Sequence, residues 1–273
     1  MKFWTLVDID LKKMLPILIV AFTVMMVLSA WIFYSAIDEM LVDIHGSLAQ
    51  GVTVAQIVEM EGQFTLSQII DLQHQLHYVL FGFMFLVLIA FLSFHIWYKE
   101  WSGQSKRIYM LLTLRMPKSR HILSKLIVIL IAVITFYGVI MLNFLIGDVM
   151  MRVMMPEGLV ASGNVREVLA SAQFAGLGFS FPMSATHLIY HLLFATVGFS
   201  VITTWVMLDR SKRIIGFITG LIYAIGAVAV WMRILTMFLF YDERILVDWA
   251  FVLIVNVLSL AISWYLINKK VTI

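Results

Sequence analysis

Residues 99–125 read KEWSGQSKRIYMLLTLRMPKSRHILSK, and this stretch lies between two long apolar runs. It carries seven of the 19 lysines and arginines of the chain, whereas Glu100 is its one acidic residue. Residues 108–114 form a short apolar patch that Pro117 ends, because proline lacks a backbone N–H and disfavours helix before it. A short amphipathic helix flanked by cations and joining two membrane spans is expected at the cytoplasmic surface. The rest of the chain can be oriented from this stretch.

The composition places the chain among membrane proteins. Of its 273 residues, 62% are hydrophobic and 13% are charged, and the mean hydropathy is +0.99. Soluble domains carry about 25% charged residues. The absence of cysteine excludes disulfides, thiolate catalysis and thiolate metal sites. We expect no cleavable signal, since the first apolar run is long enough to remain in the bilayer.

Six apolar runs, each near the ~20 residues needed to cross a bilayer, predict an all-α polytopic membrane protein. Residues 1–273 then form a single transmembrane domain. The predicted spans are residues 15–35, 77–98, 125–147, 186–208, 214–236 and 246–267. Segments 36–76 and 148–185 are expected outside the cell, the first as short amphipathic helices, and segment 99–124 is expected in the cytoplasm.

The first residues of the chain have the pattern of an interfacial helix. Apolar residues of segment 1–14 fall on one helical stripe, with charged residues off it. The stripe consists of Phe3, Trp4, Val7, Leu11 and Met14. This pattern predicts an amphipathic helix lying flat on the membrane before the first span. The alternative is a plain extension of that span, in which Asp8 and Asp10 would be costly inside hydrocarbon.

The distribution of cations predicts the orientation of the spans. With six spans, 15 of the 19 lysines and arginines fall on the side of segment 99–124. The four on the other side are Arg152, Arg166, Arg233 and Arg244. Because cytoplasmic loops are enriched in Lys and Arg, this distribution predicts that both termini are cytoplasmic.

No enzymatic motif is present. The chain contains no nucleotide-binding loop of the GxxxxGK[ST] or GxGxxG type, and no HExxH or GxSxG. Two histidine pairs, His74 with His77 and His187 with His191, have one-face helical spacing and could hold a metal or haem. No cysteine or carboxylate completes such a site, so we predict no metal. Two amides within the spans, Asn143 and Asn256, could instead link neighbouring helices.

The arrangement resembles the permease subunits of bacterial ABC transporters of the type-2 exporter family. The shared features are an interfacial amino-terminal helix, six spans, cytoplasmic termini and a cytoplasmic segment between the second and third spans. In that segment the family pattern of an acid, a glycine, a short apolar helix, a proline, an arginine and a lysine is matched over about thirty residues. The matching residues are Glu100, Gly103, Leu111 to Leu114, Pro117, Arg120 and Lys125. The long segment between the third and fourth spans departs from the family, in which a short turn is common.

The resemblance implies a transport mechanism. A separate ABC ATPase subunit would bind ATP and push on a coupling helix in each of two permease subunits, which form a homodimer or a heterodimer with a paralogue. The chain itself would be no enzyme and hold no cofactor, and it would bind no nucleic acid. The cargo would be hydrophobic or amphipathic, such as a peptide or toxin, moved across the bacterial plasma membrane. The implied coupling residues are Glu100, Gly103, Ile108, Leu111, Leu112, Arg115, Pro117 and Arg120.

Within this picture the apolar patch would dock in a cleft of the ATPase, and Glu100 would pair with a cation of that partner. Two readings from other classes stay open. The chain could be a non-transporting immunity or sensing subunit that binds a peptide, or a redox membrane protein that uses its four outer histidines.

Overall fold

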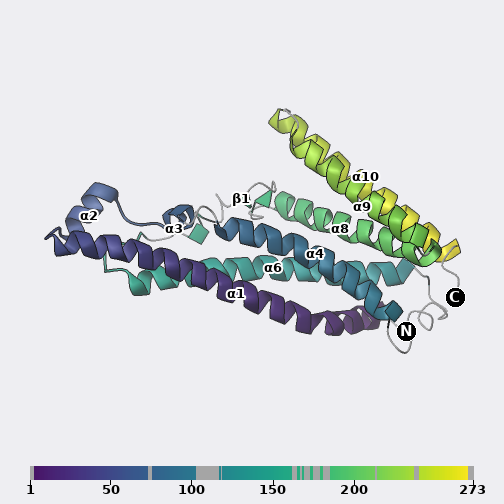
Figure 1. Ribbon diagram of the computed structural model, residues 1–273, viewed down its shortest axis with the longest axis horizontal. Coiled ribbons are helices and arrows are strands. Elements are labelled where there is room, and N and C mark those ends of the chain that lie inside the picture. The colour runs from purple at the N-terminus through teal and green to yellow at the C-terminus, as the bar shows by residue number, and fades with distance from the viewer. Residues whose placement is uncertain are drawn as a thin grey trace. The chain divides into compact units, whose positions relative to one another are not determined.

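The chain is an all-α membrane protein, seen in a computed structural model that describes residues 3–72, 76–102, 117, 119–161, 165–166, 168, 173–174, 179–180, 185–212, 214–236 and 240–269 (Figure 1). The helices are α1 (Phe3–Ala49), α2 (Val54–Glu61), α3 (Leu66–Leu72), α4 (Leu76–Ser102), α6 (Ser119–Met154), α8 (Ala185–Lys212), α9 (Ile214–Leu235) and α10 (Tyr241–Lys269). Two short strands, β1 (Gln173–Phe174) and β2 (Phe179–Ser180), pair antiparallel. Within the described ranges, six helices are long and apolar enough to cross a membrane.

The six predicted spans are confirmed as helices. They lie in α1, α4, α6, α8, α9 and α10, and of their described residues only residue 236 falls outside, one position beyond the end of α9. Continuous apolar runs of this length specify a helix because every backbone N–H and C=O must be satisfied within the segment in lipid.

The separate interfacial helix expected over residues 1–14 is not found. α1 continues from Phe3 through the first span to Ala49 as one helix of 47 residues, about 70 Å long at 1.5 Å per residue. Of the apolar stripe, Val7 and Met14 are buried in the protein, whereas Trp4 is 69% exposed. An apolar stripe alone does not distinguish a lipid interface from a neighbouring helix, and the plain extension of the span is what the structure shows.

The chain packs as two compact units. The first comprises Met1–Leu18, Leu86–Ile134 and Leu188–Ile273, and the second comprises Ile19–Phe85 and Thr135–His187. α1, α4 and α6 therefore each contribute residues to both units.

An aromatic core holds the second unit together. Phe33 of α1, Phe81 of α4 and Phe144 of α6 are all fully buried. The centroid of the Phe144 ring lies 6.4 Å from that of Phe33 and 5.7 Å from that of Phe81, in the edge-to-face geometry that aromatic pairs prefer. Gly147 allows this approach, since a Cβ at that position would lie 2.8 Å from the Phe33 ring.

The two long segments expected outside the membrane contact each other in this unit. Segment 36–76 contains the expected short helices, α2 and α3, although its first residues prolong α1. Thr53 caps α2 through a capping box with Gln56. The Phe64 N–H donates to the Leu159 carbonyl at 2.7 Å, and the Ala161 N–H donates to the Phe64 carbonyl at 3.0 Å. These two hydrogen bonds join the segments by a short bridge that the sequence did not predict.

α8 is the central helix of the first unit, and hydroxyl groups join it to α10. The Thr204 hydroxyl lies 2.9 Å from both the Ser259 carbonyl and the Ser263 hydroxyl. Asn256 donates to the Leu193 carbonyl at 3.2 Å and accepts from Ser200 at 3.1 Å. The prediction that an amide links helices is therefore confirmed for Asn256. Asn143 instead donates to Val139 of its own helix.

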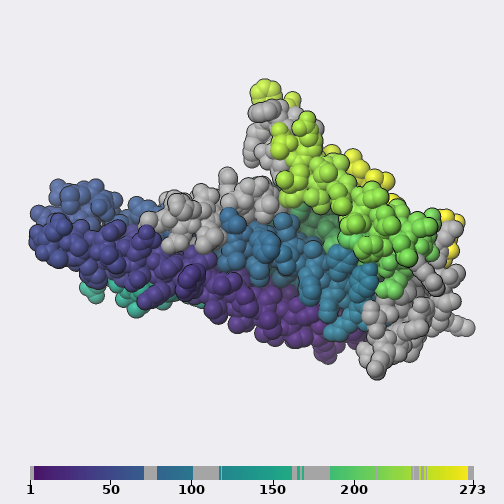
Figure 2. Space-filling model, viewed as in Figure 1, coloured from purple at the N-terminus to yellow at the C-terminus, as the bar shows by residue number. Residues whose placement is uncertain are grey.

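α9 follows α8 after a single residue and folds back along it. A Cβ on Gly216 would overlap the Leu208 carbonyl of α8, and one on Gly220 would overlap the Trp205 side chain. Two glycines four residues apart thus allow the close helix approach that small residues give in membranes. The rest of α9 is largely exposed, with Ile215, Ile222 and Ile225 more than half accessible, and Figure 2 shows the helix on the molecular surface. Exposed aliphatic side chains on a spanning helix suit contact with lipid tails.

Candidate functional site

The candidate site lies in the first unit, at both ends of the predicted coupling segment. Of the predicted coupling residues, Gly103, Ile108, Leu111, Leu112 and Arg115 lie outside the described residues. The structure does place the other three, Glu100, Pro117 and Arg120. Glu100 is buried near the end of α4, whereas Pro117 and Arg120 are exposed at the start of α6. The Arg120 N–H donates to the Pro117 carbonyl at 3.0 Å, so Pro117 enters the first turn of that helix.

Glu100 belongs to a cluster of four charged side chains from three helices, which we call the ion-pair cluster. Its members are Asp10 and Lys13 of α1, Glu100 of α4 and Lys125 of α6. A Glu100 carboxylate oxygen lies 2.8 Å from Lys125 Nζ, and its other oxygen lies 3.1 Å from Lys13 Nζ. Asp10 is 3.4 Å from each of the same two lysines. Each carboxylate therefore meets both cations.

The cluster is charge-balanced and largely buried, with Lys13 its most accessible member at 16%. The side chains of Lys125 and Glu100 are 1% and 2% exposed, and that of Asp10 is 5% exposed. Ser124 adds a hydrogen bond to Asp10 at 3.2 Å. A buried ion pair contributes little net stability, but removing one partner costs about 3–5 kcal/mol, because the other charge is left uncompensated. The ends of α1, α4 and α6 are thus held in one arrangement.

Trp97, one turn before Glu100, links the cluster to α8. Lys125 Nζ lies 5.0 Å from the centroid of the Trp97 ring, within cation–π range. The fully buried Trp97 indole donates to the Thr203 hydroxyl at 3.0 Å. Thr203 precedes Thr204, which bonds to α10. Ion pairs, a cation–π contact and hydrogen bonds thus connect α1, α4 and α6 to α8, and the adjacent Thr204 connects α8 to α10.

A second contact joins the ends of α4 and α8. The Tyr98 hydroxyl donates to Asp209 at 3.2 Å, and the Arg210 guanidinium lies 5.2 Å from the centroid of the Tyr98 ring. The contacts of Tyr98 and of the ion-pair cluster bring together the start of α1, the ends of α4 and α8 and the start of α6. Alternating spans predict that these helix ends share one side of the membrane.

The structure changes the role expected for Glu100. Its carboxylate was expected to pair with a cation of a partner protein, but it is buried and paired with two lysines of its own chain. The partners Asp10, Lys13 and Lys125 were not predicted from the sequence, in which the two lysines entered only the count of cations on the cytoplasmic side. One signal was present, since Glu100 is the lone acid in a strongly basic segment and Asp10 precedes Lys13 by one helical turn.

The histidines form no site that the structure can define. His74 and the side chain of His77 lie outside the described residues, while His187 is exposed and His191 is buried within α8. In the part of the chain that is described, no group of three or more His, Asp or Glu side chains is arranged to hold a metal ion.

The ion-pair cluster links three helices near the two ends of the predicted coupling segment. Glu100 and Lys125 bracket the predicted coupling segment and meet each other in the ion-pair cluster, so a displacement of the segment acts on α1, α4 and α6 together. No protein-family model, curated protein or solved structure matches this chain.

Proposed function

We propose that this chain is the membrane-spanning permease subunit of an ATP-driven ABC exporter of the bacterial plasma membrane. It works with a separate ATPase subunit and a second permease copy, and it moves a hydrophobic or amphipathic cargo such as a peptide. Six spanning helices and the basic segment between the second and third are the features that favour this function over other classes of membrane protein.

The observation that carries the proposal is the ion-pair cluster. A coupling segment can move spans only if its two ends are attached firmly to them. Here Glu100 precedes the segment by a few residues, Lys125 follows it, and their charged groups are 2.8 Å apart in a buried site shared with α1. A push on residues 103–116 would then shift three helices as a group, as a rigid-body switching movement requires.

The orientation of the chain supports the same function. The cluster brings together helix ends on the side that holds 15 of the 19 lysines and arginines, the side expected to face the cytoplasm. An ATP-hydrolysing subunit would approach from that side.

Replacing Leu111 or Leu112 by Asp tests the proposal. Burying a leucine is worth about 1.5–3 kcal/mol, and 1.4 kcal/mol corresponds to a factor of ten in affinity. We therefore expect at least tenfold less vanadate-sensitive ATPase activity to purify with tagged Leu111→Asp or Leu112→Asp chains from native membranes. Leu111→Met and Leu112→Met keep the apolar surface and serve as matched controls that should retain the ATPase.

Equal ATPase recovery from the Asp and Met variants would mean that the segment only anchors the chain at the membrane surface. If no ATPase purifies with the unaltered chain but the chain binds a peptide, the result would instead indicate the immunity or sensing subunit.

A further inference from the structure

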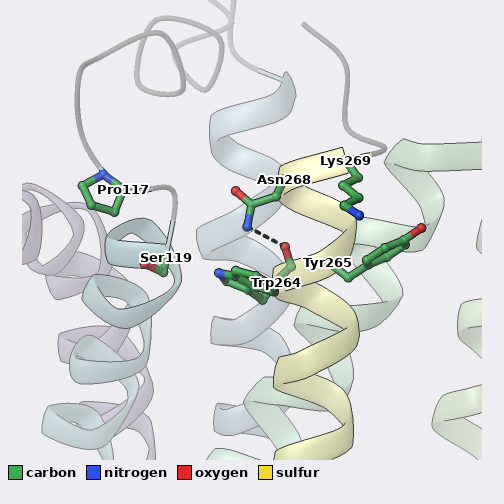
Figure 3. Close-up of a pocket in the computed structure, with 6 residues that line it drawn as sticks. All are labelled: Pro117, Ser119, Trp264, Tyr265, Asn268 and Lys269. Carbon is green, nitrogen blue, oxygen red and sulfur yellow. Dashed lines mark hydrogen bonds between the residues drawn. The ribbon is translucent and has the colours of Figure 1, made fainter.

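A groove separates the start of α6 from the end of α10 in the first unit. Its outer part is a pocket of about 300 Å³ lined by Pro117, Ser119, Trp264, Tyr265, Asn268 and Lys269 (Figure 3). Its deeper part, of about 270 Å³, shares Ser119 and Trp264 with the first and adds Arg120 and four aliphatic side chains. In Figure 3 the Trp264 indole extends from α10 toward Ser119.

The charge of this groove is positive. Arg120 and Lys269 line it, and none of the described residues in its lining is acidic. Both cations are exposed, and no acidic side chain in the described ranges forms an ion pair with either one. α6 begins at Ser119 and has no acidic residue in its own first turn, so the helix itself supplies no counter-charge to the positive end of its dipole. An anion at the mouth of the groove would meet both cations.

Below the cations the groove becomes apolar at the depth of a lipid tail. Leu126 lies six residues beyond Arg120 and Leu260 lies nine residues before Lys269, about 9 Å and 14 Å along their helices at 1.5 Å per residue. Trp264 and Tyr265, both substantially exposed, lie between these levels, as aromatic residues do at the boundary of headgroups and hydrocarbon. Along the groove, the cations, the aromatic rings and the aliphatic side chains therefore lie in the order of the phosphate, the headgroup–hydrocarbon boundary and the acyl chain of a phospholipid.

We propose that the groove between α6 and α10 binds an anionic phospholipid of the adjoining leaflet, its phosphate against Arg120 and Lys269 and one acyl chain along Leu126 and Leu260. Basic pockets between spanning helices on the cytoplasmic side are suited to anionic headgroups. A zwitterionic lipid fits the same apolar wall but carries an ammonium group that two cations repel. Pro117 and Arg120 of the groove are also predicted coupling residues, but lipid binding requires no ATPase, so the lipid measurement can fail or succeed independently of the proposed function.

Native mass spectrometry of the purified full chain tests this proposal. The chain is released from mixed micelles that contain equal amounts of dioleoylphosphatidylglycerol and dioleoylphosphatidylcholine, and the retained lipids are counted. We expect excess retention of phosphatidylglycerol. The double variant Arg120→Gln/Lys269→Gln should lower the phosphatidylglycerol-to-phosphatidylcholine ratio at least fivefold, the factor that corresponds to about 1 kcal/mol for one cation at a membrane surface.

The matched control is Lys99→Gln/Lys212→Gln, which removes two exposed cations from the ends of α4 and α8 with the same change in net charge. If this control lowers the phosphatidylglycerol-to-phosphatidylcholine ratio equally, the preference depends only on net charge and the proposed lipid site is wrong. If excess inorganic phosphate releases the lipid, the two cations bind free phosphate rather than a lipid headgroup. If the chain is instead released as a dimer that retains no lipid, the groove is occupied by a second copy and the lipid proposal is wrong.

A second measurement reports on the groove without altering its charge. Dibrominated acyl chains quench a tryptophan that they touch, and Trp264 lines both parts of the groove. Dibrominated phosphatidylglycerol should quench the protein in vesicles more than dibrominated phosphatidylcholine does, and Trp264→Phe should abolish the difference. Equal quenching by the two lipids in the unaltered chain would overturn the proposal.

Discussion

Glu100 has a buried carboxylate whose two oxygens each meet a different lysine. In an isolated sequence such an acid within a basic segment suggests an exposed contact for a partner. The three-dimensional arrangement reverses this interpretation, because the carboxylate neutralises Lys13 and Lys125 inside the protein. A substitution here would therefore act first on folding, and a loss of transport in Glu100→Ala would not by itself indicate a coupling defect.

A double-substitution cycle separates the two effects. Glu100→Met and Lys125→Met should each destabilise the chain by roughly 3–5 kcal/mol, because each leaves an uncompensated buried charge. The double variant keeps Asp10 opposite Lys13 and should recover more than half of the loss. Thermal unfolding in detergent, followed by size-exclusion chromatography, measures both.

Lys12→Met is the control for this cycle, since the Lys12–Asp8 pair is well exposed, with side chains 73% and 54% accessible. Exposed pairs contribute little, so its unfolding temperature should hardly change. Single variants as stable as the unaltered chain would show that the ion-pair cluster does not hold the three helices.

At this scale the sequence predicted residue types better than residue partners. Charge and spacing drew attention to Glu100, Pro117 and Arg120, all near the ends of the segment. Partners 87 to 115 residues away along the chain, such as Lys13 for Glu100 and Lys125 for Asp10, depend on which helices pack together. No local pattern carries that information.

Among the elements, the hairpin of α8 and α9 depends on the absence of a side chain at Gly216. Gly216 lies against the backbone of α8 at Leu208, which cannot move aside as a flexible side chain can. Gly226, on the same helix, has no atom within 4 Å of the position of an added Cβ. The two glycines lie on the same helix and differ in the space around an added Cβ.

Gly216→Ala should lower the unfolding temperature, since overpacking costs about 1–3 kcal/mol. Gly226→Ala should leave it unchanged or raise it slightly, because alanine favours helix. Both variants are compared in the same detergent by thermal unfolding. Equal unfolding temperatures would mean that α9 is not packed closely on α8.

The elements themselves were the most predictable level of this structure. Long apolar runs fix spanning helices regardless of their neighbours, which explains why all six were found. The first helix was the exception, because the stripe of residues 1–14 is compatible with lipid or with protein. The continuity of α1 from Phe3 to Ala49 distinguishes the extended span from a separate helix, and a local pattern does not carry that information.

For the whole molecule, orientation in the membrane is the property that any coupling mechanism requires. The chain has no cysteine, so single cysteines can be introduced without a background. In intact cells an impermeant thiol reagent should label Ser47→Cys, near the end of α1, but not Ser105→Cys. Permeabilised cells should show labelling at both positions. The reverse pattern in intact cells would show that the orientation is inverted. Segment 99–124 would then face away from the cytoplasm and could not contact an ATPase there.

The bridge between Phe64 and residues 159–161 has a consequence for the making of the protein. Its halves are separated by 95 residues of chain, the spacing also of the Gln63–Gly158 hydrogen bond. At the 5–20 residues per second of ribosomal synthesis, the second half emerges about 5–20 s after the first. During that interval the backbone N–H and C=O of Phe64 lack the partners that Leu159 and Ala161 provide in the finished protein. The link between the two segments can therefore form only after translation has passed the third span.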